Sequence, residues 1–323
     1  MRRHQVYQIG GVVVAIFLLV FPRYSPIILV HRFVEIFIFA LFAVSFNLLF
    51  GYGGMLPFGH AALFGVGAYS TALIFNHFPQ FPLLLSLLIG ALSGLVAGVL
   101  IGFFCVRLSG AYFSLASLAF QMFFYAVAVK WRSLTQGDDG MSLIRPDLHL
   151  PVMGSLPMGD INNLYYLTLL ISALGIFACY FFLKTPLGNS VVCMRENDIR
   201  ASFLGYNVFL TKLVIFSAGA FLAGLAGTLF ALFEGFVATS CIDMNMSLHI
   251  LLITVIGGTT HFFGPVLGAV FYLFFQEWLS SLTEHWWLFM GIVFVVVVMY
   301  LEGGLISLFD LGGIRFWVRR QEK

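Results

Sequence analysis

A stretch of 71 residues without a charged side chain most constrains what this chain can fold into. No Asp, Glu, Lys or Arg occurs between Glu35 and Arg107. Further uncharged stretches are 108–129, 161–183, 213–233, 244–276 and 285–301. Charged residues make up 9% of the chain, against about 25% in soluble domains. This pattern excludes a soluble enzyme, a disordered chain and a nucleic-acid-binding domain, and it leaves a polytopic α-helical membrane protein.

Ten membrane spans are predicted, because a bilayer core needs about 20 apolar residues per helix. Turn residues at 51–57 and 78–82 divide the 71-residue stretch into three passes. The spans are expected near 6–22, 27–50, 58–77, 83–106, 110–129, 162–183, 209–235, 246–260, 263–282 and 285–303. The pair within 246–282 is short and glycine-interrupted, so it either spans twice or re-enters. The predicted fold is all-α, with about ten (8–10) transmembrane helices, some broken or re-entrant, in one domain over 1–323.

Positive charges predict the orientation. Lys and Arg concentrate in cytoplasmic loops, and here they gather at the N-terminus, between the sixth and seventh spans, and in the C-terminal tail. These residues are Arg2, Arg3, Lys184, Arg195, Arg200, Lys212, Arg315, Arg319, Arg320 and Lys323. With ten spans, both termini and all of these charges lie on the cytoplasmic side. The long loop 130–161 is then extracytoplasmic, and loop 184–208 and tail 304–323 are cytoplasmic.

The cytoplasmic loop 184–208 carries a helix signal. Ile199 and Phe203 are spaced at a helical interval. Asn197 or Asp198 is placed to cap a short helix that Gly205 ends. Such a helix indicates either docking onto a soluble partner or a loop helix resting on lipid headgroups, and the residues alone do not separate these two interpretations.

Two glycine patterns lie within the predicted spans. Small residues recur every four positions at Gly90, Gly94, Gly98 and Gly102, and again at Gly219, Ala223 and Gly227. Such stripes let helix backbones approach closely. They favour packing inside the bundle, with an interface to a partner subunit as the alternative.

A second glycine signal is a break in an apolar run. Residues 51–59 hold several glycines and Pro57, and they lead directly to His60. Non-helical backbone at membrane depth survives only where it is buried in protein or lines a wet cavity. Discontinuous helices of this kind often form transport sites. The run 257–265 is similar, although a simple helix–helix turn explains it equally well.

Enzyme signatures are absent from the sequence. There is no GxSxG, no HExxH and no phosphate-binding glycine loop. The four cysteines have no CxxC spacing, and the histidines show no metal-ligand spacing. The chain is therefore interpreted as a transport protein without catalytic residues. Since few ionisable residues lie within the spans, ion-coupled transport is less favoured than transport powered by a separate ATPase.

These motifs resemble a known family. The run Asn47–Tyr69 resembles the N-terminal signature of the LivM/LivH-type permeases of branched-chain amino acid ABC importers. Arg195-Glu196-Asn197 with Ala201 and Leu204-Gly205 is similar to their coupling loop. Further similar elements are Gly110-Ala111-Tyr112, Leu134–Met141, and Ile256-Gly257-Gly258 with Gly264-Pro265 and Gly268. The resemblance covers about 36–310, and the chain's size favours the LivM type. Its departures are Ala111 for an Asp, Pro57-Phe58 for a Ser-Leu-like pair, and Gln136 within a glycine pair.

The resemblance implies a permease domain in a bacterial inner membrane. Its partners would be a LivH-like second permease, two cytoplasmic ATPases, an extracytoplasmic substrate-binding protein and membrane lipid, with no nucleic acid. ATP and Mg would bind to the ATPases, and this chain would hold no cofactor. The residues expected to couple to an ATPase are Arg195, Glu196, Asn197, Asp198, Ala201 and Gly205. The residues expected along the substrate pathway are Asn47, Gly53, Gly54, His60 and Gly258.

The predicted function is alternating-access import of branched-chain or related amino acids. Urea and short-amide importers share this permease type, so these substrates are an alternative. A self-contained channel or secondary carrier is a second alternative, and it would act without ATPases. A membrane-embedded enzyme is a third, but it would need a cluster of polar residues at one depth, which the sequence does not indicate.

Overall fold

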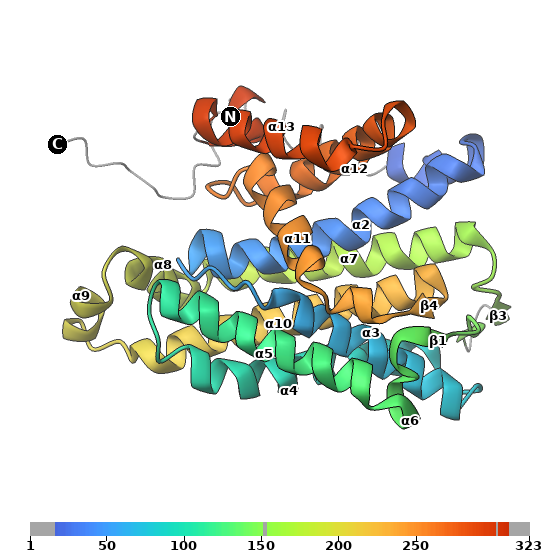
Figure 1. Ribbon diagram of the computed structural model, residues 1–323, viewed down its shortest axis with the longest axis horizontal. Coiled ribbons are helices and arrows are strands. Elements are labelled where there is room, and N and C mark those ends of the chain that lie inside the picture. Colours follow the sequence, from blue (N-terminus) through green and yellow to red (C-terminus); the bar gives the residue numbers. More distant parts are fainter. Residues whose placement is uncertain (1–16, 151–153, 302, 310–323) are drawn as a thin grey trace.

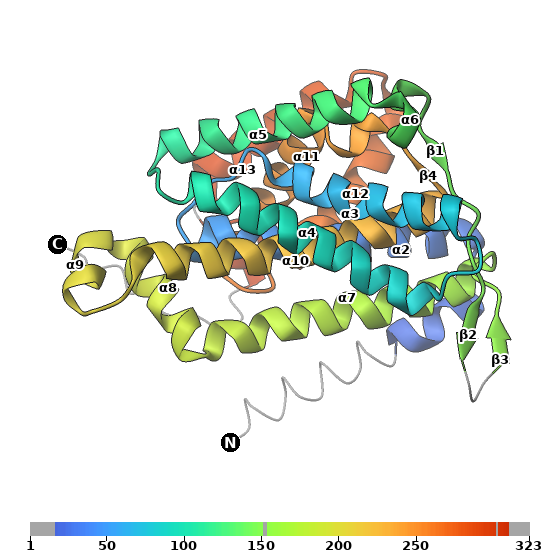
Figure 2. The ribbon, with the colours of Figure 1, turned by 90° about the horizontal axis from the view of Figure 1, so that it is seen from below.

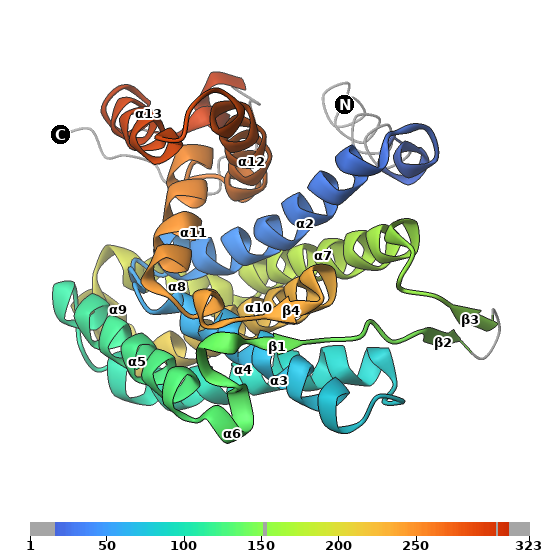
Figure 3. The ribbon, with the colours of Figure 1, turned by 45° about the vertical axis from the view of Figure 1, so that its right-hand side comes forward.

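The computed structural model describes residues 17–150, 154–301 and 303–309, and most of that length is helical. Six helices run along the long axis of the molecule (Figure 1): α2 (Ile27–Asn47), α3 (His60–His77), α4 (Leu83–Cys105), α5 (Ala111–Lys130), α7 (Ile161–Lys184) and α10 (Val208–Glu234). Figure 2 shows α5 and α7 on opposite sides, with α3, α4 and α10 between them. Helix α11 (Met244–Gly257) leads from this group to α12 (Gly264–Leu282) and α13 (Trp286–Tyr300) (Figures 1 and 3).

Shorter elements mark the two ends of the bundle. One end carries α8 (Pro186–Glu196) and α9 (Asp198–Phe203) (Figure 1). The other carries α6 (Arg132–Thr135) and two antiparallel ladders, in which β1 (Met141–Ser142) pairs with β4 (Phe236–Val237), and β2 (Leu148–Leu150) pairs with β3 (Gly154–Leu156). The all-α prediction missed these strands, which are too short to give an alternating pattern.

The nine predicted spans from 27 onward each coincide with a helix to within a few residues. The first, 6–22, lies mostly outside the described residues, and residues 17–24 are helical. Five helical segments are long and apolar enough to cross a membrane: Ile27–Tyr52, Leu83–Cys105, Ala111–Lys130, Ile161–Lys184 and Val208–Glu234. Helices α11 and α13 are shorter but apolar. The chain is therefore multi-pass, and the count of ten spans stays a prediction.

Helix α2 forms the centre of the core. It packs against α3, α7, α10, α11 and α12. From Ile38 to Leu49 every side chain is buried. Lipid can cover an apolar helix as well as protein can, so the central position of α2 follows from its contacts with the surrounding helices.

Both glycine stripes pack inside the bundle, as the favoured interpretation predicted: the stripe on α4 lies against α10, and Gly227 of the stripe on α10 lies against α3. A methyl group on Gly94 would lie 2.8 Å from the Ala220 carbonyl oxygen and 2.8 Å from the Cα of Gly224. One on Gly224 would lie 2.9 Å from the Gly90 carbonyl oxygen. The two backbones therefore touch over more than one turn. On another face of α10, Gly219 lies against Leu49.

Candidate functional site

The predicted break begins at the end of α2. The helix continues as a π-helix over Leu48–Tyr52, and regular structure resumes only at His60. The first amides of the break are still bonded to the π-helix, since Gly53 N–H donates to Leu48 O (3.1 Å) and Met55 N–H to Leu49 O (3.0 Å). Gly54 has φ +66°, a conformation that favours glycine. The break predicted over 51–59 is thus present, displaced by two residues.

Helix α5 satisfies the later part of the break. Ser114 Oγ donates to Leu56 O (2.7 Å), and Gly59 N–H donates to Ser117 Oγ (3.3 Å). Both serines are buried. Non-helical backbone inside a membrane protein needs such partners, because lipid offers none.

A second irregular segment, 238–243, meets the break inside the bundle. It precedes α11, and Ser247 in the first turns of α11 accepts a hydrogen bond from Ala61 N–H at the start of α3 (3.1 Å). Gln121 of α5 is fully buried and donates to Ile242 O (2.7 Å). The starts of α3 and α11 therefore lie together against α5. Irregular segments therefore precede and follow α11.

His60 and Asn47, two of the predicted pathway residues, are buried beside the break. His60 Nε2 lies 2.9 Å from Ser45 Oγ, and its ring stacks on Phe42. Its Nδ1 has no hydrogen-bond partner among the described residues. Asn47 lies against Gly51 and is 2% exposed. Neither residue lines a described cavity.

Gly258 lies apart from the other predicted pathway residues. It has φ +109° at the end of α11 and packs against Gly303 and Gly304. Its neighbour Thr259 reaches the π-helix, because a methyl group on Gly51 would lie 2.7 Å from the Thr259 carbonyl oxygen. The residue after Gly258 therefore lies against the same π-helix glycine as Asn47.

The segment 184–208 forms two short helices with local caps. Thr185 caps α8, and its Oγ1 accepts from Gly188 N–H (3.3 Å). Asn197 caps α9, with Oδ1 3.0 Å from the amides of both Ile199 and Arg200. Gly205 follows α9 with φ +88°. The predicted capped helix is confirmed, with Asn197 rather than Asp198 as the cap.

Three exposed side chains of α9 and its C-terminal end are apolar, and the polar residues Arg200 and Ser202 are exposed beside them. Ile199 is 67% exposed, Phe203 86% and Leu204 73%. Among the predicted coupling residues, Arg195, Glu196 and Asn197 are also exposed, whereas Ala201 is buried. The helical spacing of Ile199 and Phe203 was noted in the sequence, but neither they nor Leu204 were predicted as coupling residues.

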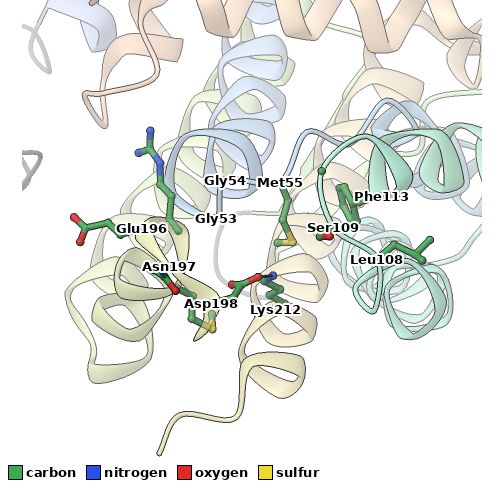
Figure 4. A pocket seen from close by; sticks show the side chains of 13 residues that line it. Gly53, Gly54, Met55, Leu108, Ser109, Phe113, Glu196, Asn197, Asp198 and Lys212 are labelled. Atoms are coloured by element: carbon green, nitrogen blue, oxygen red, sulfur yellow. Dashed lines mark hydrogen bonds and ion pairs between the residues drawn. The ribbon is translucent and has the colours of Figure 1, made fainter. Parts of the chain in front are cut away.

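A cavity of about 190 Å³ lies between this segment and the neighbouring part of the bundle (Figure 4). Its walls are the break (Gly53, Gly54, Met55), the α4–α5 turn with the start of α5 (Leu108, Ser109, Gly110, Phe113), the α8–α9 junction (Met194, Arg195, Glu196, Asn197, Asp198) and Lys212 of α10. Figure 4 shows Asp198 and Lys212 pointing toward one another, and their ion pair measures 2.5 Å. The structure thus brings the predicted coupling residues 195–198 together with Gly53 and Gly54.

Direct contact joins the two predicted groups of residues at one point. A methyl group on Gly54 would lie 3.1 Å from Arg195 Cγ. A larger side chain at position 54 would therefore collide with Arg195. Lys212, Met55 and the polar residues of α5 were not predicted as site residues. For α5 a signal existed, because Ser114, Ser117 and Gln121 recur at helical spacing within an otherwise apolar helix.

The arrangement defines a multi-pass helical membrane protein with a polar break inside its bundle and an exposed capped helix at one end. A family model described as "Branched-chain amino acid transport system / permease component" matches residues 28–299. The chain belongs to this family of transport permeases.

Individual relatives agree with the family. The high-affinity branched-chain amino acid transport system permease protein LivM of Salmonella typhimurium is 29% identical over 84% of this chain and 68% of its own length. A probable branched-chain amino acid transport permease protein LivM of Methanocaldococcus jannaschii is 22% identical over 83% of this chain and 90% of its own. The guanosine ABC transporter permease protein NupQ of Bacillus subtilis is 25% identical over 69% and 73%. No solved structure gives a significant match.

Proposed function

We propose that this chain is the permease subunit of an ATP-binding-cassette importer for branched-chain or related amino acids. It lies in a bacterial inner membrane with both termini in the cytoplasm. Two ATPases bind ATP and Mg below it, a LivH-like permease lies beside it, and an extracytoplasmic protein delivers substrate. The chain itself carries out no catalysis and binds no cofactor. Family membership supports the transport role and the amino-acid substrate class.

The observation that carries the ATPase-driven mechanism is the apolar surface of α9. Ile199, Phe203 and Leu204 project from a six-residue helix at the end of the bundle. Exposed aromatic and aliphatic side chains on a rigid support serve well as anchors in a partner's groove. A helix that only rested on lipid headgroups would not need contacts with the bundle. This segment has two, the ion pair of Asp198 with Lys212 and the packing of Arg195 against Gly54.

Two contacts would transmit a movement of the docked α9 to the membrane domain. Asp198, the first residue of α9, pairs with Lys212 of α10. Arg195, at the end of α8, touches Gly54 in the break. Closure of the ATPases would thus displace α10 and the break together. The cavity leaves space between the α8–α9 junction and the α4–α5 turn, so packed side chains would not block such a displacement toward that turn.

The test replaces the α9 anchor. Phe203→Glu places a charge in the contact, and we expect ATPase subunits copurifying with the tagged chain to fall by about thirtyfold, the effect of losing a strong anchor. Ile144→Glu is the matched control, since Ile144 is 90% exposed and follows β1, which lies at the other end of the bundle from α9 (Figure 1). Equal ATPase recovery with Phe203→Glu and the wild-type chain would refute the docking role.

The substrate is tested separately with the complete complex. We expect labelled leucine, isoleucine or valine to be taken up in the presence of the binding protein. The guanosine permease among the relatives makes nucleosides a second candidate class, and urea and short amides are a third. Uptake of guanosine or urea without uptake of any branched-chain amino acid would replace the substrate assignment while leaving the ATPase-driven mechanism intact.

A further inference from the structure

Two irregular segments, far apart in the sequence, start their helices at the same place in the bundle. The break over 53–59 leads into α3, and residues 238–243 lead into α11. The first turns of a helix leave backbone N–H groups without intrahelical partners, so two such starts inside a membrane domain need donors and acceptors from elsewhere. The N–H of Ala61 in α3 donates to Ser247 of α11, and Asp243 caps α11. Helix α5 supplies side-chain partners to both irregular segments that precede these starts.

Gln121 of α5 is bonded to the segment before α11 and to the start of α11. Its Nε2 donates to Ile242 O at 2.7 Å, and its Oε1 accepts from Ser247 Oγ at 3.1 Å. Ser247 Oγ in turn accepts from Ala61 N–H at the start of α3, also at 3.1 Å. A continuous chain of hydrogen bonds therefore runs from α5 through α11 to α3.

The buried residues of α5 differ from the rest of the helix in being mostly polar. The helix is exposed over most of its length, and its buried residues are Phe113, Ser114, Ser117, Gln121 and Ala128. Three of these five are polar, and all three bond to the irregular segments or to α11. An apolar side chain of similar size at 121 would avoid the cost of burying an amide. The amide is thus explained by the backbone groups that it holds.

Helix α5 also reaches the cavity beneath the break. Leu108, Ser109 and Gly110 form the turn before α5, and with Phe113 they line the wall opposite Asp198 (Figure 4). A helix transmits displacement along its axis as a nearly rigid body. Motion that closes or opens the cavity would therefore carry Gln121, and with it the starts of both α3 and α11.

We propose that Gln121 is a positioning residue for transport, whose amide makes the starts of α3 and α11 move with α5 as one unit. The proposal rests on the proposed function, because it assigns this unit to the ATP-driven cycle. Removing the amide breaks the link from α5 to Ile242 and Ser247, although Ser247 still joins α11 to α3. The two starts then no longer follow α5, so ATP hydrolysis continues while translocation fails. The residue is argued to act through the backbone of the two segments and not by contact with substrate.

The experiment uses the complete complex, purified through a tag on this chain and placed in proteoliposomes with labelled leucine. Gln121→Leu is expected to lower uptake per assembled complex by about tenfold, the scale of losing buried hydrogen bonds. ATP hydrolysis stimulated by the loaded binding protein should persist, because α8 and α9 are unchanged. The number of ATP molecules hydrolysed per substrate transported should rise accordingly. Thr168→Val is the control, since Thr168 is fully buried and its hydroxyl has no hydrogen-bond partner among the residues that the structure describes.

Ser247→Ala provides a second variant should Gln121→Leu fail to assemble. It removes the only atom that joins Gln121 to Ala61 N–H but leaves the bond from Gln121 to Ile242. We expect the same rise in ATP consumed per substrate, at a smaller magnitude. An unchanged ratio in either assembled variant, or a parallel loss of uptake and hydrolysis, would overturn the inference. Absence of uptake by the wild-type complex for every candidate substrate would instead refute the proposed function.

Discussion

At the scale of single residues, long-range polar contacts to backbone carbonyls hold the irregular parts of this protein. Arg145 in the loop 130–161 donates from Nε to Leu232 O (2.8 Å) and from a terminal nitrogen to Phe233 O. It therefore satisfies the C-terminal carbonyls of α10, which a helix leaves without partners. The ladder between β1 and β4 fixes this loop in place. Arg145 was not predicted as a structural residue, because its partners lie 87 and 88 residues away.

Replacing Arg145 should destabilise the end of α10 without affecting insertion. Arg145→Ala leaves two carbonyls without their charged donor, and we expect the free energy of unfolding in detergent to fall by about 1.5 kcal/mol. Thermal or denaturant unfolding of the purified chain measures this change. Arg23→Ala, which removes an exposed guanidinium, should fall within about 0.5 kcal/mol of the wild type. Equal stability of the two variants would show that the Arg145 contacts contribute nothing.

At the scale of helices, the sequence predicted where the helices lie in the chain and that the glycine stripes pack inside the bundle. It did not predict where the irregular segments meet. Hydropathy located the helices, because a helix that crosses a bilayer needs about 20 consecutive, mostly apolar residues. The Asn197 cap and the Gly205 end were predictable, since both depend on neighbours within a few residues. The network around Gln121 was not, because Ile242 and Ser247 lie 121 and 126 residues away. Polar residues at helical spacing in α5 were the only available signal.

The α4–α10 contact gives a prediction at this scale. Gly94→Leu inserts a side chain where the two backbones already touch, and we expect the free energy of unfolding to fall by about 3 kcal/mol. Val96→Leu enlarges a side chain on the same helix that is 56% exposed, and it should change stability little. Unfolding of both variants in detergent compares them directly. A Gly94→Leu chain as stable as the Val96→Leu chain would contradict the close packing.

At the scale of the whole molecule, the parts form a path from one end of the bundle to its interior. The exposed apolar side chains lie on α9, the ion pair of Asp198 with Lys212 joins α9 to α10, and Arg195 touches Gly54. The cavity separates this end from the turn that starts α5. The uncharged stretch 36–106 supplies the break at 53–59 but no Asp, Glu, Lys or Arg for coupling to an ion gradient. Energy is therefore expected to enter from the end that carries α8 and α9.

The most direct test of this account is ATP-dependent uptake by the complete complex in proteoliposomes. With binding protein outside and ATP supplied to the ATPases, we expect labelled leucine to accumulate above its external concentration. Omitting ATP, or omitting the ATPases from the reconstitution, should reduce accumulation to the level of empty vesicles. Uptake at the same rate by this chain without ATP or ATPases would identify a channel or secondary carrier and contradict the central claim.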